Sequence, residues 1–227
     1  MTSPFPRLVF FAGLAALLAA CAGTPVPDWQ MNARTAIERA TAAYLEGNTR
    51  VEMQEFKQAR SEIARTGRTD LLARVELTRC AGRVASLVLE DCTEFEKLRL
   101  DAAAPERAYA DFLAGRIKAQ DIALLPPQHR AVAGATSDTA ATAALQNIAD
   151  PLAQLVAAGV LLRSNRATPA VLTAAVDTAS AQGWRRPLLA WLGVQALRAE
   201  NAGDTVAAEH LRRRIALVQN AANSGQP

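Results

Sequence analysis

The sequence predicts an all-α protein in which antiparallel helical hairpins stack into a short α-solenoid, with no β-sheet. Apolar residues recur at spacings of three and four along most of the chain, which is typical of amphipathic helices. Half of the residues are hydrophobic but only 5% are aromatic, and the abundant alanine favours helices that pack closely through small side chains. No segment alternates between apolar and polar residues over a useful length, so we expect no strand.

The chain opens with the pattern of a secreted protein. An apolar run at residues 8–20 follows Arg7 and ends in small residues, which is the order of a bacterial secretory signal. A membrane-spanning helix needs ~20 apolar residues, more than this run provides. We therefore expect a cleaved leader rather than a transmembrane anchor.

The end of the run, Leu18-Ala19-Ala20-Cys21, resembles the lipobox of bacterial lipoproteins. The resemblance implies cleavage before Cys21 and acylation of that residue with diacylglycerol and palmitate. Ala22 stands where some lipoproteins carry an Asp that retains them at the inner membrane, so the resemblance implies an outer-membrane lipoprotein facing the periplasm. The alternative is an ordinary signal peptide with a chance cysteine.

Stretches rich in Gly, Thr or Pro mark the expected boundaries between segments of the chain. Gly, Thr and Pro follow Cys21 and predict a short tether, and Leu124-Leu125-Pro126-Pro127 predicts a break between two helical sets. We expect six segments: a signal peptide at 1–20, a lipidated tether at 21–27, N-terminal helical hairpins at 28–115, an irregular Pro-containing connection at 116–136, a C-terminal helical set at 137–220 and a flexible tail at 221–227.

A first hairpin is expected between Asp28 and Gly67. Asp28 can cap its first helix, and Gly47 can end that helix in the left-handed conformation. Thr49 and Glu52 have the spacing of a capping box that would open the second helix. The tight turn between the two apolar stripes predicts an antiparallel pair.

This hairpin resembles a tetratricopeptide repeat. The matching positions have the family's pattern of small, Gly-Asn turn, aromatic and small residues: Ala36, Ala40, Gly47-Asn48, Phe56 and Ala59. A weaker echo near the C-terminus consists of Ala196, Gly203-Asp204 and Ala208. Glu52, Ala64 and Arg212 depart from the family pattern, and no 34-residue period joins the two echoes. A generic helical hairpin with the same turn is the alternative.

Two cysteines remain if Cys21 carries lipid. Cys80 lies on the apolar face of a helix that starts at Thr69, and Cys92 lies at the start of a short helix beyond Glu90-Asp91. An oxidising compartment favours a Cys80–Cys92 disulfide. Bridged Cα atoms lie within about 7 Å of each other, so the helix must end near Val88 or earlier. Free buried thiols and pairing with another partner are the alternatives.

The other helices follow from apolar stripes bounded by Pro and Gly. The stretch 152–162 is apolar on nearly every side, which predicts a buried central helix. The remaining helices are expected at about 105–115, 137–150, 168–183, 187–203 and 205–219.

Few residues suggest chemistry. His129 and His210 have no metal-ligand spacing around them, so we expect each to be solvated or locally hydrogen-bonded. An acidic cluster could bind calcium or serve acid–base work, but helix capping explains it better: Glu90, Asp91, Glu94 and Glu96. Other carboxylates are only loose candidates for an active site: Glu46, Glu55, Asp111 and Asp121.

Binding residues are equally few. Tyr44 and Trp184 are the aromatic side chains we name as weak candidates for a binding surface. Arg212-Arg213-Arg214 could face membrane phosphates, but the three side chains point around most of a helical turn, which favours a solvated helix. Net charge is only +3, or +2 without the leader, so no nucleic-acid partner is expected.

The sequence thus predicts a non-catalytic, lipid-anchored helical scaffold that binds another envelope protein or peptide and needs no cofactor or metal. Two other classes stay open. One is a cell-envelope enzyme, which would need paired carboxylates in a groove. The other is a small-ligand or lipid-binding helical bundle, which a closed apolar cavity would distinguish.

Overall fold

A computed structural model gives the structure of residues 26–224, and it is all-α, with no strand in this range. The lipobox and Cys21 lie outside the described residues. The helices are α2 (Asp28–Glu46), α3 (Thr49–Ala64), α4 (Thr69–Ala85), α5 (Thr93–Glu96), α6 (Ala104–Leu113), the 3-10 helix η2 (Ala119–Leu124), α7 (Pro127–Ala133), α8 (Asp138–Gln146), α9 (Pro151–Arg163), α10 (Pro169–Ala181), α11 (Arg185–Asn201) and α12 (Thr205–Ser224). None of these helices is long and apolar enough to cross a membrane.

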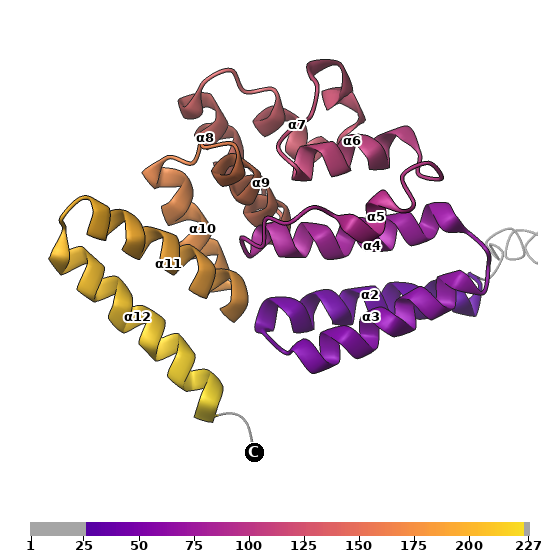
Figure 1. Cartoon of the computed structure of the whole chain (residues 1–227), viewed down its shortest axis with the longest axis horizontal. Helices are drawn as coiled ribbons and strands as arrows, with labels where there is room; N and C mark the ends of the chain where they lie inside the picture. The colour runs from indigo at the N-terminus through magenta and orange to yellow at the C-terminus, as the bar shows by residue number, and fades with distance from the viewer. Residues whose placement is uncertain (1–25, 225–227) are drawn as a thin grey trace, which may run out of the picture.

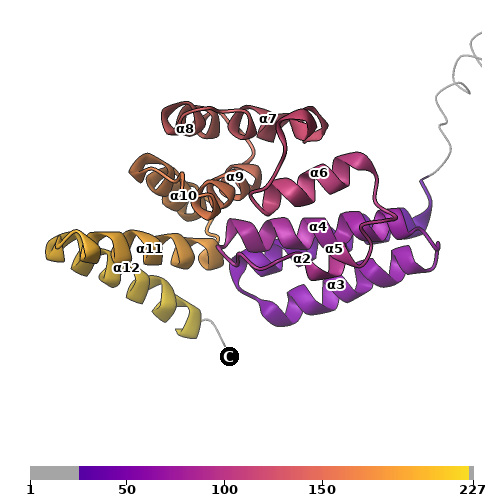
Figure 2. The same ribbon diagram turned by 45° about the horizontal axis from the view of Figure 1, so that its top comes forward.

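Neighbouring helices pack against each other along the chain, as the predicted fold class requires. Figure 1 shows the α2–α3 hairpin at one end, α4 and α6 above it, and the α11–α12 hairpin at the other end. Figure 2 shows α7 and α8 as an outer layer over α6, α9 and α10. Some contacts join helices that are far apart in the chain: α9 packs on α4, and α11 packs on α2.

The α2–α3 hairpin forms as predicted, but its turn is built differently. Gly47 ends α2 with a φ of 87°, a left-handed conformation that disfavours other residues. The predicted Thr49–Glu52 capping box is wrong. Asn48 caps α3 instead, accepting a hydrogen bond from the Val51 amide at 3.2 Å. Glu52 is buried and accepts a hydrogen bond from Arg79 Nε at 3.2 Å. The carboxylate that the predicted capping box required therefore pairs with a residue of α4 instead.

The predicted central helix, α9, is buried along most of its length. Its closest neighbour is α4, where Gly159 faces Val84. An added Cβ at Gly159 would overlap the Val84 carbonyl oxygen, so only glycine allows this approach of the two backbones. Trp191 of α11 is fully buried against the end of α4, and its Nε1 donates a hydrogen bond to the Ala85 carbonyl at 3.0 Å.

The connection at 116–136 is more ordered than its sequence suggested. It contains η2 and α7. Pro127 is the first residue of α7, a position where the N–H that proline lacks would have no hydrogen-bond partner within the helix. Leu125 is fully buried between the two elements. One hydrophobic cluster, which we call the central core, runs from Ala73 to Leu211 and includes residues on both sides of this connection.

Candidate functional site

The residues that suggested chemistry are dispersed. No group of three or more His, Cys, Asp or Glu side chains within residues 26–224 is arranged to hold a metal ion. The acidic cluster around Cys92 is engaged in separate ion pairs: Glu90 with Arg83, Asp91 with Arg163, Glu94 with Lys97 and Glu96 with Arg99. Each of these carboxylates therefore has a cationic partner close by.

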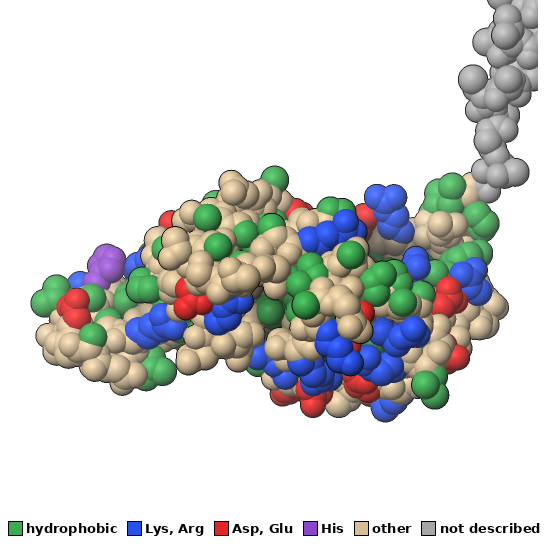
Figure 3. Space-filling view, turned by 90° about the horizontal axis from the view of Figure 1, so that it is seen from above, with side chains coloured by type: hydrophobic (Ala, Val, Ile, Leu, Met, Phe, Trp, Pro, Cys, Tyr) green, Lys and Arg blue, Asp and Glu red, His purple; other side chains and the backbone are tan. Residues whose placement is uncertain are grey.

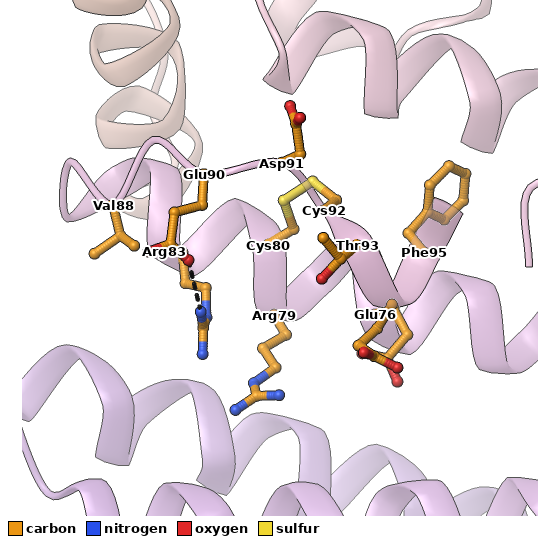
Figure 4. Close-up of a pocket in the computed structure, with 11 residues that line it drawn as sticks. Glu76, Arg79, Cys80, Arg83, Val88, Glu90, Asp91, Cys92, Thr93 and Phe95 are labelled. Carbon is orange, nitrogen blue, oxygen red and sulfur yellow. Dashed lines mark ion pairs between the residues drawn. A yellow bond between two sulfur atoms is a disulfide. The ribbon is translucent and has the colours of Figure 1, made fainter. Parts of the chain in front are cut away.

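Those ion pairs surround the disulfide. Cys80 and Cys92 are bridged with their Cα atoms 5.7 Å apart, and α4 ends at Ala85, which meets the geometric condition expected from the sequence. Figure 4 shows the disulfide above the Arg79 and Arg83 side chains, at a cavity of about 230 Å³. Arg83 lies 3.7 Å from the Glu90 carboxylate. Arg83 and Glu90 pair with each other within this cavity, whereas its other charged side chains pair with residues outside its lining.

His129 was expected to be solvated or locally hydrogen-bonded, but the structure buries it. It lies on the inner face of α7, a helix that the sequence analysis missed, and only 1% of its surface is exposed. Its ring stacks on Tyr109 with 5.6 Å between centroids and lies 5.0 Å from that of Phe112. Nδ1 has no hydrogen-bond partner, and burial lowers the pKa of His129 to about 4, although the charge of Asp150 opposes this shift.

Tyr109 also lines a hollow at the surface. It has a volume of about 410 Å³ and is formed by α4, α6 and the η2–α7 segment, and we call it the α4–α6–α7 hollow. Its lining combines apolar side chains with a few polar ones: Arg74, Leu77 and Thr78 from α4, Pro105, Glu106 and Tyr109 from α6, and Leu124, Leu125, Pro126, Pro127 and Arg130.

The charges in this hollow are unevenly paired. Arg74 Nε lies 2.5 Å from Glu106 Oε1, so these two form an ion pair. Arg130 Nε donates to the Leu125 carbonyl at 2.7 Å, and its guanidinium makes no ion pair within the described part of the chain. Desolvation and the charge of Asp150 raise the pKa of Tyr109, which keeps its phenol protonated. The hollow therefore combines an apolar wall with one unpaired cation and holds no activated nucleophile.

The two aromatic candidates lie away from this hollow. Tyr44 is buried, contrary to a role as an exposed binding anchor, because Arg186 of α11 covers its ring with 4.2 Å between the guanidinium carbon and the centroid. Trp184 is the N-cap residue of α11 and packs partly buried against the central core.

The other polar candidates are also spread out. Asp111 is paired with Arg99 at 2.7 Å, and Glu46 is exposed at the end of α2. Glu55 and Asp121 are half-buried on α3 and η2. In the arginine run of α12, Arg212 pairs with Glu200 and Arg213 lies 4.0 Å from Glu209, which fits a solvated helix.

Local patterns could not reveal the hollow, because its lining residues come from three segments that only tertiary packing brings together. Comparisons with known proteins add no relative: no protein-family model, no curated protein and no solved structure matches this chain.

Proposed function

We propose that this chain is a lipid-anchored, non-catalytic scaffold of the bacterial cell envelope, held at the outer membrane by Cys21 and facing the periplasm. Its helical array binds a segment of another envelope protein or a peptide. The lipobox supports the anchor, since two or more acyl chains on one residue give stable membrane attachment. The described helices support a soluble binding body attached to that anchor.

The observation that carries the binding role is the α4–α6–α7 hollow. Binding sites for peptides combine apolar pockets with a few placed polar groups. Here Pro105, Pro127 and Leu124, which is 38% exposed, supply apolar surface, and Arg130 supplies an unpaired positive charge. The partner segment that fits is one with apolar side chains and an acidic group for Arg130.

The anchor is tested by labelling cells with radioactive palmitate and fractionating them. Wild type should carry the label and sediment with membranes, and Cys21→Ser should lose both properties. The double variant Cys80→Ser/Cys92→Ser is the matched control and should keep the label. Membrane retention of unlabelled Cys21→Ser would contradict the anchor.

The binding role is tested with a photo-crosslinking benzoylphenylalanine at Leu124 and, as a control, at Leu197, which is 57% exposed on α11. We expect Leu124 to crosslink a defined partner segment, identified by mass spectrometry, and Leu197 not to. Arg130→Glu should abolish the crosslink, whereas Arg198→Glu, a charge reversal on α11, should leave it unchanged. Equal crosslinking from both positions would contradict a partner site in the hollow.

A further inference from the structure

A second hollow lies between α2 and α4, and its floor is almost wholly apolar. It has a volume of about 320 Å³ and opens to the surface, and we call it the α2–α4 groove. Its floor consists of Trp29, Ala33, Ile37, Ile63, Leu71 and Val75. Ala33, Ile63 and Val75 are buried members of the small hydrophobic cluster of the α2–α3 hairpin, and the other three pack against it while remaining partly exposed.

Apart from Gln30, the polar side chains that line this groove have partners within the chain. Arg34 donates to Glu38 at 2.9 Å, and Arg74 is paired with Glu106. Thr78 donates its hydroxyl to the Arg74 carbonyl at 3.0 Å. A peptide would leave its own backbone N–H and C=O groups without partners against such a surface. An occupant that needs no hydrogen bonds fits better, and a hydrocarbon chain is one.

The groove also begins where the described chain begins. Val26 is 52% exposed, α2 starts two residues later, and Trp29 lines both the groove and a neighbouring hollow that includes Arg65. Figure 3 shows hydrophobic side chains gathered around this point of the surface. Cys21 is five residues before Val26, and five extended residues reach at most ~18 Å. A lipid on Cys21 is therefore always close to the groove.

We propose that the α2–α4 groove receives one acyl chain of the lipid on Cys21. This inference rests on the proposed lipid anchor. It adds that one acyl chain lies in the protein while the others insert into the membrane. A chain held in the groove is withdrawn from the bilayer, so the remaining chains carry the attachment. The groove differs in this respect from the α4–α6–α7 hollow, where the unpaired Arg130 favours a charged partner.

The first test asks whether the empty groove binds a hydrocarbon chain. The full-length Cys21→Ser protein, which cannot carry the lipid, is titrated with cis-parinaric acid, a fluorescent fatty acid that accepts energy from tryptophan. We expect saturable one-to-one binding with tryptophan-sensitised emission. In this background Trp29→Phe should keep the binding but lose most of the energy transfer, because Trp29 is the tryptophan in the groove.

Two charge insertions locate the site. Leu71→Arg places a charge in the groove and should weaken binding at least tenfold, whereas Leu217→Arg, on a side chain 71% exposed on α12, should leave it unchanged. Circular dichroism and melting curves check that both variants fold. Palmitate should displace the probe about 15-fold better than myristate, since each buried CH₂ contributes about fourfold in affinity. No binding, or normal binding by folded Leu71→Arg, would overturn the inference.

The second test asks whether the protein's own lipid fills the groove. Benzoylphenylalanine is placed at Glu38, on the groove rim, or at Glu209 on α12 as the control, in cells labelled with radioactive palmitate. After irradiation and trypsin digestion, label should appear on the peptide at residues 35–39 only with the Glu38 probe. Label confined to the peptide at residues 21–34 would overturn the inference and leave the anchor intact. Absence of label from the whole protein would contradict the anchor itself.

Discussion

The α2–α3 hairpin and the central core are stabilised in different ways. The hairpin has its own small cluster of alanines with Phe56 and Ile63, and three buried carboxylates lie around it: Glu52, Glu62 and Glu76. The central core is larger and contains no buried carboxylate, and it depends on close backbone approach and a disulfide. The comparison shows that the packing of the hairpin depends on pairing of buried charges, whereas the packing of the central core depends on the fit of its apolar surfaces.

The hairpin's carboxylates are each matched by an arginine. Arg60 pairs with Glu76, Arg65 with Glu62, and Arg79 with Glu52. The arginines stay partly exposed while the carboxylates are almost fully buried. Arg79 also lies over the Phe56 ring at 4.6 Å, so its aliphatic part covers the small cluster. Removal of an arginine would leave a buried negative charge uncompensated.

The largest effect is expected from Gly159→Ala in the central core. The new methyl group would overlap the Val84 backbone oxygen, which cannot move away like a flexible side chain. We expect a loss of about 4 kcal/mol in the free energy of unfolding, measured by urea denaturation. Gly193→Ala in α11 is the control, since nothing lies within 4 Å of its added Cβ, and it should be neutral or stabilising. Equal effects of the two substitutions would refute the close crossing of α4 and α9.

Loss of the disulfide should have the next largest effect. The bridge closes a short loop, with a sequence separation of 12 between Cys80 and Cys92. Replacement of both residues by Ala should lower the free energy of unfolding by about 3 kcal/mol. The same loss should appear when dithiothreitol reduces wild type, and the reductant should not affect the double variant. A melting temperature of wild type that reduction does not change would show that the bridge is not a stabilising element.

His129 gives the central core a pH dependence. Its pKa is about 4 in the folded protein, below its ordinary value of 6.5. As pH falls below 6.5, the unfolded chain therefore takes up the proton first, and stability is lost down to about pH 4. Between pH 7.5 and 4.5 wild type should lose between about 2 and 3 kcal/mol more than His129→Gln. His210→Gln, at an exposed histidine of α12, should behave like wild type.

The smallest of these effects should come from the hairpin, and its pH dependence has the opposite sign. Burial raises the pKa of Glu76, although Arg60 opposes this shift. Arg60→Met should cost about 2 kcal/mol at neutral pH because Glu76 stays buried and charged. The loss should shrink in acid, as protonation of Glu76 removes the charge. Adding Glu76→Gln should restore stability, and Arg34→Met, at an exposed pair, should have no measurable effect.

Much of the fold could be predicted from the sequence because the helices are local structures. Apolar stripes and Gly or Pro boundaries predicted α2 to α6 and α8 to α12 without knowledge of their partners. α7 was missed because Pro126-Pro127 also has the pattern of a break, whereas here Pro127 starts a helix. The cap of α3 is Asn48 rather than the predicted Thr49, since Glu52, the second member of the predicted capping box, pairs with Arg79 on another helix.

The candidate sites were much less predictable. The sequence does not distinguish Gly159 from the other small residues, because its importance comes from the contact with Val84 of another helix. His129 was expected to be solvated or locally hydrogen-bonded because no metal-ligand spacing surrounds it, but Tyr109 and Phe112 of α6 cover it. The two hollows need side chains from two or three helices each, and no local pattern contains that information.

The contact of α11 with the α2–α3 turn has a consequence for how the chain folds. Arg186 donates to the Thr49 hydroxyl at 2.9 Å across 137 positions of sequence, and its guanidinium also covers Tyr44. Loop-closure entropy grows with the logarithm of length, so this junction carries a higher entropic barrier than any hairpin turn. We therefore expect the local contacts of the first hairpin to form before its docking onto α11.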